Sequence, residues 1–146
     1  MALIGTWCNM YQAPQKPDIA ELTWSGTPTA AAFTYSMSVD QQTSSFATVS
    51  SGTDIDLPAG HYYAIAYIDF TRLATGTNNE IYWYLDGSQI GMRGGSDHYQ
   101  NESNDNPEAT FTLNEPGTLT LRQTAWSGTA LTLTTYCKAL IWRVSK

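Results

Sequence analysis

The chain has 146 residues, a formal net charge of −6 and only 14% charged residues, against roughly 25% in an ordinary soluble domain. This length suits one folding unit with one core, so we expect a single domain over residues 1–146. The seven Lys and Arg residues are scattered singly, and no run approaches the about 18 apolar residues that span a bilayer, which excludes a basic stripe for nucleic acid and a membrane-spanning segment.

The N-terminal segment, residues 1–17, is expected to begin with a strand and to end in a kink. Its first 13 residues offer apolar side chains at Leu3, Trp7 and Met10, and two prolines then interrupt any strand ladder. The start lacks the basic region and the continuous apolar stretch of a secretory signal. We therefore expect the chain as given to be made in a cytoplasm and to be soluble.

Residues 19–53 carry a weaker strand pattern. Leu22 and Trp24 indicate a short strand, and β character returns between residues 30 and 35. Residues 36–53 are mostly polar, and we interpret them as a long connection with one short strand.

The clearest strand signals lie between residues 58 and 92. Residues 62–70 follow a Pro-Ala-Gly turn and are apolar or aromatic on both faces, which predicts a central strand buried on both sides. Ile81 to Leu85 alternate in the same way, and Asp86-Gly87 predicts a tight two-residue hairpin.

Residues 94–107 form a polar stretch without periodicity, which we interpret as a long exposed loop. Loops well beyond the median of about 4–6 residues are often functional. The carboxylates in this stretch could bind calcium, but their spacing is not that of an EF-hand, and we favour a solvated loop without metal. The candidate contact residues of this loop are Asp97, His98, Tyr99, Asn101 and Asn104.

The last third of the chain predicts three strands. Residues 109–113 and 118–124 alternate apolar and polar side chains around a Pro-Gly turn, which predicts one antiparallel hairpin. Residues 138–144 form a closing hydrophobic strand. No segment holds a helical period over ten residues, so we expect an all-β, antiparallel fold of about eight to ten strands, which fits a two-sheet sandwich or a barrel.

Catalytic chemistry is not indicated by the sequence. His61 and His98 are the only histidines, and no nucleophile-elbow pattern accompanies them. Cys8 and Cys137 lie far apart without a CxxC or His pairing, so we expect two buried thiols, with a disulfide as the alternative. We expect a non-enzymatic protein with no catalytic residue, cofactor or metal.

The predicted turns and strands follow one another in an order that resembles a known fold. An aromatic strand follows the turn Pro58-Ala-Gly60, a hairpin forms at Leu85-Asp-Gly87, and a Pro-Gly turn at 113–118 precedes the closing strand. This succession resembles the tumour-necrosis-factor-like jelly roll, which includes the complement globular heads, over roughly residues 40–146. The resemblance implies a jelly-roll sandwich.

Within that family the resemblance implies a homotrimer whose aromatic faces pack around a three-fold axis. The nine Tyr and five Trp exceed what one small core requires. The candidate trimer-interface residues are Tyr62, Tyr82, Tyr84, Tyr99, Trp126 and Tyr136. We assign four other aromatic residues to the core: Trp83, Trp142, Tyr63 and Tyr67.

A short jelly roll with neither a signal peptide nor a Gly-x-y stalk resembles the small head decoration and fibre proteins of tailed bacteriophages. That likeness implies a decoration or cement protein, made in the host cytoplasm, that binds the major capsid protein at the capsid surface of the virion and stabilises the head. The alternatives are a phage tail-fibre or receptor-binding tip and a bacterial lectin-like carbohydrate-binding module. The candidate capsid anchor is formed by Leu3, Trp7, Met10 and Tyr11.

Overall fold

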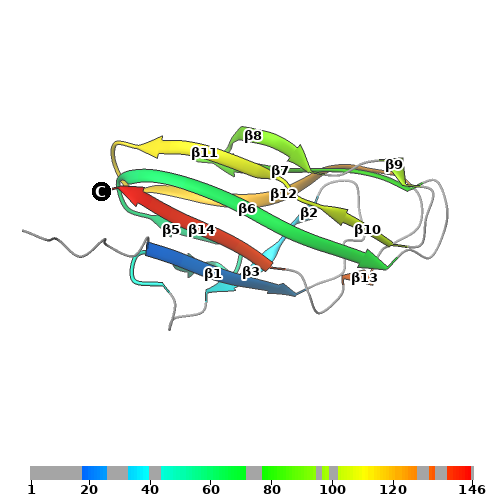
Figure 1. The fold of residues 1–146 in the computed structure, drawn as a ribbon, viewed down its shortest axis with the longest axis horizontal. Helices are drawn as coiled ribbons and strands as arrows, with labels where there is room; N and C mark the ends of the chain where they lie inside the picture. Colours follow the sequence, from blue (N-terminus) through cyan, green and yellow to red (C-terminus); the bar gives the residue numbers. More distant parts are fainter. Residues whose placement is uncertain are drawn as a thin grey trace, which may run out of the picture.

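The computed structural model describes residues 18–25, 33–39, 44–71, 77–94, 97–98, 102–127, 132–133 and 138–145. Every regular element in these ranges is a β-strand (Figure 1). The strands are β1 (Asp18–Ser25), β2 (Phe33–Thr34), β3 (Ser36–Val39), β4 (Thr48–Ser50), β5 (Asp54–Leu57), β6 (Gly60–Thr71), β7 (Thr77–Leu85), β8 (Ser88–Gly94), β9 (Asp97–His98), β10 (Glu102–Asp105), β11 (Glu108–Leu113), β12 (Gly117–Ser127), β13 (Thr132–Leu133) and β14 (Lys138–Ser145). The described residues contain no helix that could cross a membrane.

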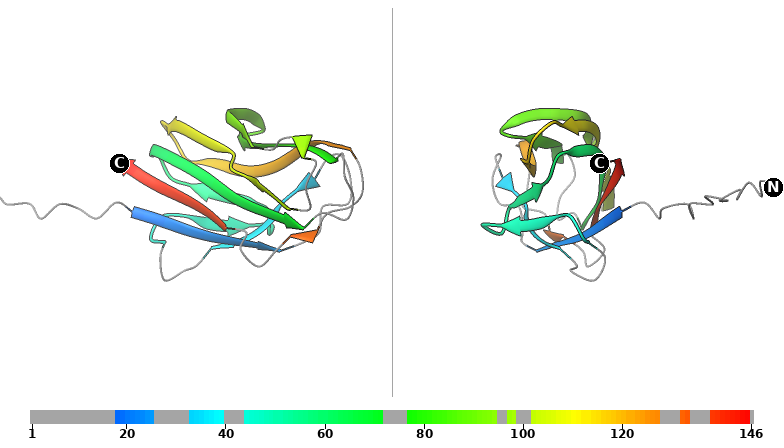
Figure 2. Two further views of the ribbon diagram at one scale, coloured as in Figure 1. Left: turned by 45° about the vertical axis from the view of Figure 1, so that its right-hand side comes forward. Right: turned by 90° about the vertical axis from the view of Figure 1, so that its left-hand side faces the viewer.

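The strands form two antiparallel layers. The first layer runs β3-β1-β14-β6-β11, and the second runs β8-β7-β12-β5-β4. Figure 1 shows β11, β6, β14 and β1 side by side, and the end-on view of Figure 2 shows how the strands surround the middle of the molecule. One edge is closed by β8, which pairs with β7 and also places Met92 opposite Glu108 of β11. The expected all-β, two-sheet antiparallel sandwich is confirmed.

The core packs large side chains of the second layer against alanines at several positions of the first layer, which also buries larger side chains such as Tyr62 and Ile141. The buried alanines of the first layer are Ala20, Ala64, Ala66, Ala109 and Ala139. The second layer supplies Trp83, Ile81, Leu119 and Leu121, all 0% exposed. Large side chains that face small ones interdigitate without voids, which explains why the two layers pack closely. The assignment of Trp83 to the core is confirmed.

The hairpin predicted at residues 86 and 87 is confirmed. Asp86 and Gly87 have φ angles of 46° and 82°, as a two-residue turn with two left-handed residues requires. The Asp86 carboxylate also accepts a hydrogen bond from the Thr118 N–H at 2.8 Å, which ties the hairpin to β12.

The predicted hairpin between residues 109–113 and 118–124 is wrong. Strand β11 pairs with β6 and β8 in the first layer, whereas β12 pairs with β2, β5 and β7 in the second. The turn at 114–116 therefore crosses from one sheet to the other. Alternation shows that each strand has one buried face, but it does not say which strand is its neighbour.

The burial expected for the aromatic strand is also wrong on one face. Tyr62, Ala64 and Ile68 of β6 point into the core, but Tyr67 on the opposite face is 42% exposed. Tyr63 and Trp142 are half-buried. The outer face of β6 is apolar although no other described strand covers it.

The polar tract at residues 36–53 contains two strands where one was expected. These are β3 and β4, and Met37 of β3 is 5% exposed. The Met37 N–H donates to the Gly52 carbonyl at 2.6 Å, which joins the edges of the two layers. The outward positions of these short strands carry polar side chains, so the few inward apolar residues do not stand out as a strand pattern in the sequence.

Gly91 allows β8 to approach β11. Gly91 has a φ of +73°, and a Cβ there would lie 2.1 Å from the Glu108 carbonyl oxygen and 2.5 Å from the Ala109 Cβ. Gly52 has a similar φ of +71°, but nothing lies within 4 Å of its Cβ position. The two glycines therefore share the same backbone strain and differ in the space around them.

We predict that Gly91→Ala lowers the free energy of unfolding by at least about 2 kcal/mol more than Gly52→Ala. The left-handed backbone penalises both substitutions, so the difference isolates the contact between β8 and β11. Urea denaturation followed by circular dichroism measures both variants. Equal losses would contradict the close approach of β8 to β11.

Candidate functional site

The outer face of the first layer carries a continuous apolar surface, which we call the aromatic face. It consists of Ile19, Tyr63, Ile65, Tyr67, Leu140 and Trp142. The strand register places these residues side by side: Trp142 lies opposite both Ile19 and Tyr63, and Leu140 lies opposite Ile65. The rings of Tyr63 and Trp142 pack at a centroid distance of 5.4 Å. No other described strand covers this face.

Polar side chains surround the aromatic face. The Tyr63 hydroxyl donates to Glu108 Oε2 at 2.8 Å, and Lys138 forms an ion pair with Glu21. His61 Nδ1 lies 2.8 Å from Thr112 Oγ1. An apolar centre with a polar, hydrogen-bonded rim is the usual composition of a protein interface.

The hydrogen bond to Glu108 raises the pKa of Tyr63 above its ordinary value. The carboxylate accepts the phenol proton and so favours the neutral phenol, while burial and the negative charge of Glu108 act in the same direction to a smaller extent. The contribution of this bond to stability is present below the ordinary tyrosine pKa and is lost as the pH rises through the raised value.

The prediction that Tyr62 contributes to a trimer interface is wrong. Its side chain is 0% exposed, its ring packs against Phe46 and Phe111, and its hydroxyl donates to the Pro58 carbonyl at 2.7 Å. Burial raises the Tyr62 pKa. Tyr62 therefore has no surface to offer to a second chain.

Two other candidate interface residues, Tyr82 and Tyr84, lie away from the aromatic face. Tyr82 and Tyr84 are half-buried on the outer face of the second layer, where the Arg122 guanidinium lies 4.7 Å from the Tyr84 ring centre. Trp126 lies in β12 opposite Asn79. The remaining interface and anchor candidates lie outside the described residues: Tyr99, Tyr136, Leu3, Trp7, Met10 and Tyr11.

The expected loop at residues 94–107 contains two short strands. Asp97 and His98 form β9, which pairs with β7, and Asn104 of β10 lies opposite Asp69 of β6. The interpretation as an irregular loop is wrong because β6 continues beyond β11, and β10 supplies partners for its backbone groups. Tyr99 and Asn101 lie outside the described residues.

Among the residues that the structure describes, no group of three or more His, Cys, Asp or Glu side chains could hold a metal ion. Cys8 and Cys137 lie outside these residues.

Sequence reasoning missed Ile19, Ile65 and Leu140 as surface residues. Their signal was present, because residues 62–70 and 138–144 are apolar on both faces. That pattern predicts burial of both faces. Burial against a second chain would produce the same sequence pattern as burial within one chain.

Neither a protein-family model nor a curated protein matches this chain. Many solved structures are similar in fold, and three of them illustrate the similarity. Murine APRIL at pH 5.0 has 10% identity and a TM-score of 0.67, with 88% of this chain and 100% of that chain covered. Eiger TNF from S. frugiperda has 12% identity and a TM-score of 0.59, with 88% and 92% covered.

Rabbit GITRL has 12% identity and a TM-score of 0.53, with 86% of this chain and 93% of that chain covered. At such low identity these similarities show the fold alone. The chain is a tumour-necrosis-factor-like jelly roll, as the order of its sequence features implied.

We predict that Glu108→Gln lowers the Tyr63 pKa towards its ordinary value, because the amide removes the negative charge that favours the neutral phenol. NMR of 13C-labelled tyrosine across an alkaline titration measures the shift. Glu115→Gln is the matched control, because it makes the same change in net charge. Glu115 is exposed in the turn that follows β11. An unchanged Tyr63 pKa in Glu108→Gln would contradict the hydrogen bond.

Proposed function

We propose that this chain is a non-enzymatic structural protein that associates as a homotrimer through the aromatic face. The observation that carries the proposal is that Tyr63, Tyr67 and Trp142 lie together on an outer sheet face that no other described strand covers. Contiguous apolar patches of this kind are uncommon on monomers and mark sites of association.

The energetics favour association through this face. Full burial of one large apolar side chain contributes about 1.5–3 kcal/mol, so the partly exposed aromatic residues of each subunit together contribute several kcal/mol. The opposing entropy of association is of the same order. The polar rim around Glu108 and the ion pair between Glu21 and Lys138 would fix the orientation of the subunits.

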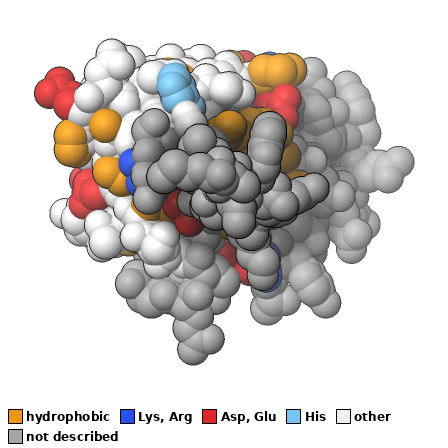
Figure 3. All heavy atoms as spheres, turned by 60° about the vertical axis from the view of Figure 1, so that its left-hand side comes forward, with side chains coloured by type: hydrophobic (Ala, Val, Ile, Leu, Met, Phe, Trp, Pro, Cys, Tyr) orange, Lys and Arg blue, Asp and Glu red, His pale blue; other side chains and the backbone are white. Residues whose placement is uncertain are grey.

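We propose further that the trimer is a bacteriophage decoration protein, located at the capsid surface of the virion, whose partner is the major capsid protein. The part of the described surface that faces the viewer in Figure 3 supports this proposal, because it has apolar patches and few charged side chains. A protein that binds only the assembled head stabilises that head by mass action. A tail-fibre or receptor-binding tip is the alternative, with a different location on the particle.

We predict that the wild-type protein has three times its chain mass of 16.1 kDa in solution and that Tyr67→Glu dissociates it into monomers. A carboxylate at Tyr67 would lose its hydration in the trimer, and Lys138, which lies opposite it in β14, already pairs with Glu21, so its burial is unfavourable. Light scattering measures the mass, and circular dichroism verifies the fold. Tyr84→Glu is the matched control. Tyr84 lies on the outer face of the other layer, so this variant should remain a trimer.

The same samples are then mixed with phage capsids assembled without this protein. Co-sedimentation of the wild-type trimer with these capsids would support decoration. A trimer that does not bind them favours the receptor-binding alternative, and a monomeric wild-type protein would overturn the homotrimer.

A further inference from the structure

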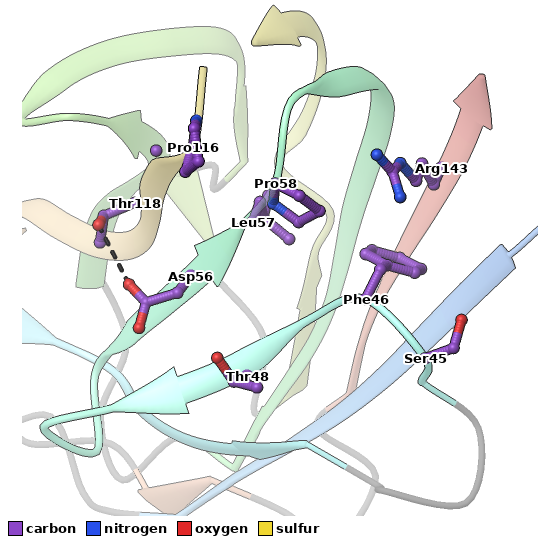
Figure 4. A pocket seen from close by; sticks show the side chains of 10 residues that line it. Ser45, Phe46, Thr48, Asp56, Leu57, Pro58, Pro116, Thr118 and Arg143 are labelled. Atoms are coloured by element: carbon purple, nitrogen blue, oxygen red, sulfur yellow. Dashed lines mark hydrogen bonds between the residues drawn. The ribbon is translucent and has the colours of Figure 1, made fainter. Parts of the chain in front are cut away.

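An open pocket of about 500 Å3 lies at the end of the sandwich where the β5–β6 turn, the β11–β12 turn and the end of β14 meet. Figure 4 shows Arg143 and Phe46 on one side of it, Asp56, Thr48 and Thr118 on the other, and Pro58 between them. Its volume is within the range of about 300–1,000 Å3 typical of sites for small ligands.

Arg143 gives one side of the pocket a fixed positive charge. Its Nη2 donates to the Ala59 carbonyl, and its guanidinium lies 6.0 Å from the centre of the Tyr62 ring. A Cβ at Gly60 would lie 2.9 Å from Arg143 Nε, so the glycine leaves room for the side chain. No carboxylate of the described residues forms an ion pair with Arg143. Its charge is available to a ligand, although Asp18 lies across from it in β1.

Part of the pocket wall is apolar, and hydrogen bonds fix the loop that carries one of its side chains, Phe46. Phe46 is half-buried and packs against Tyr62 at a centroid distance of 5.9 Å. The loop that carries Phe46 is fixed by Ser44 Oγ, which accepts hydrogen bonds from the N–H groups of Phe46 and Ala47 at 3.4 and 3.0 Å. Phe46 and Pro58 both contribute apolar surface to the pocket wall.

Hydrogen-bonding groups occupy the opposite side. Asp56 Oδ1 accepts a hydrogen bond from the Thr118 hydroxyl at 3.2 Å, and Thr48 lies beside them in the pocket wall. A carboxylate accepts several hydrogen bonds, and a hydroxyl both donates and accepts. This side suits a ligand rich in hydroxyl groups.

We propose that the pocket binds a sugar residue that carries a carboxylate, such as a hexuronic acid. The sugar carboxylate pairs with Arg143, the ring stacks on Phe46 and Pro58, and the hydroxyls donate to Asp56. Arginine recognises carboxylates with charge-assisted hydrogen bonds, which gives the site its selectivity for an acidic sugar over a neutral one.

A peptide carboxylate fits the pocket less well. Strand β5, which carries Asp56 and Leu57, is paired on both edges, with β4 and with β12. It therefore has no free edge for an added peptide strand. Asp56 would also repel a second acidic group of such a peptide.

The site is separate from the aromatic face, so the proposed trimer and this activity can fail independently. The test is an NMR titration of the full chain with methyl β-D-glucuronide and, separately, with methyl β-D-glucoside. We expect amide shifts at residues 45–48, 56, 57, 117 and 118, and a dissociation constant at least tenfold lower for the glucuronide.

Arg143→Met should weaken glucuronide binding at least tenfold, whereas Arg143→Lys should retain part of it because the charge remains. Arg122→Met is the matched control: it makes the same charge change over the Tyr84 ring on the outer face of the second layer and should leave binding unchanged. Asp56→Asn offers an independent variant and should weaken binding of both sugars, since the amide accepts fewer hydrogen bonds than the carboxylate.

Four results would overturn the proposal, three of them from the sugar titrations. Those three are equal binding of the two sugars, shifts confined to residues outside the pocket, and no saturable glucuronide binding up to about 10 mM, a concentration corresponding to a very weak complex. Tighter binding of an acidic peptide than of the glucuronide at the same amides would also overturn it and would assign the pocket to a protein partner.

Discussion

The carbonyl oxygen of Pro107 joins the two layers of the sandwich. It accepts a hydrogen bond from the indole N–H of Trp83 in β7 and another from the backbone N–H of Ala66 in β6, both at 3.0 Å. Pro107 is buried, and Gly94 of β8 lies so close that a Cβ there would come within 2.4 Å of the proline ring. An unpaired buried polar group is costly, so these donors fix the relative position of β6, β7 and the start of β11. The closed edge of the sandwich depends on this arrangement.

The packing of large side chains of the second layer against alanines of the first layer bears on the aromatic face. Trp83 and its aliphatic neighbours in the second layer fill the core, which leaves room for only alanine at several inward positions of β6 and β14. Bulky side chains of these two strands also occupy the outward positions, where Tyr63, Ile65 and Trp142 meet. The outward side chains of these strands form the aromatic face, which is the surface through which we propose association.

Tight turns were predictable from the sequence, but the pairing of strands that are distant in the chain was not. The turn at Asp86 and Gly87 needs two left-handed residues, and that requirement is visible in the sequence. The partners of β11 were not predictable, because a strand with one buried face looks the same whether its neighbour in the chain is beside it or across the core. Apolar residues on both faces of β6 likewise indicate burial without naming what buries them. The pocket was invisible for another reason: Phe46, Asp56, Thr118 and Arg143 come from separate segments, and none of them forms a motif alone.

The two proposed surfaces meet in β14. Adjacent residues of a strand point to opposite faces, so Trp142 lies on the aromatic face while Arg143 points towards the pocket (Figure 4). The register of β14 against β6 shows an irregularity between Arg143 and Ser145, at the end where Gly60 makes room for the arginine. A shift of β14 by one residue would turn Trp142 inward and Arg143 outward, which would remove both surfaces at once. Self-association and ligand binding therefore use different side chains but depend on the same strand register.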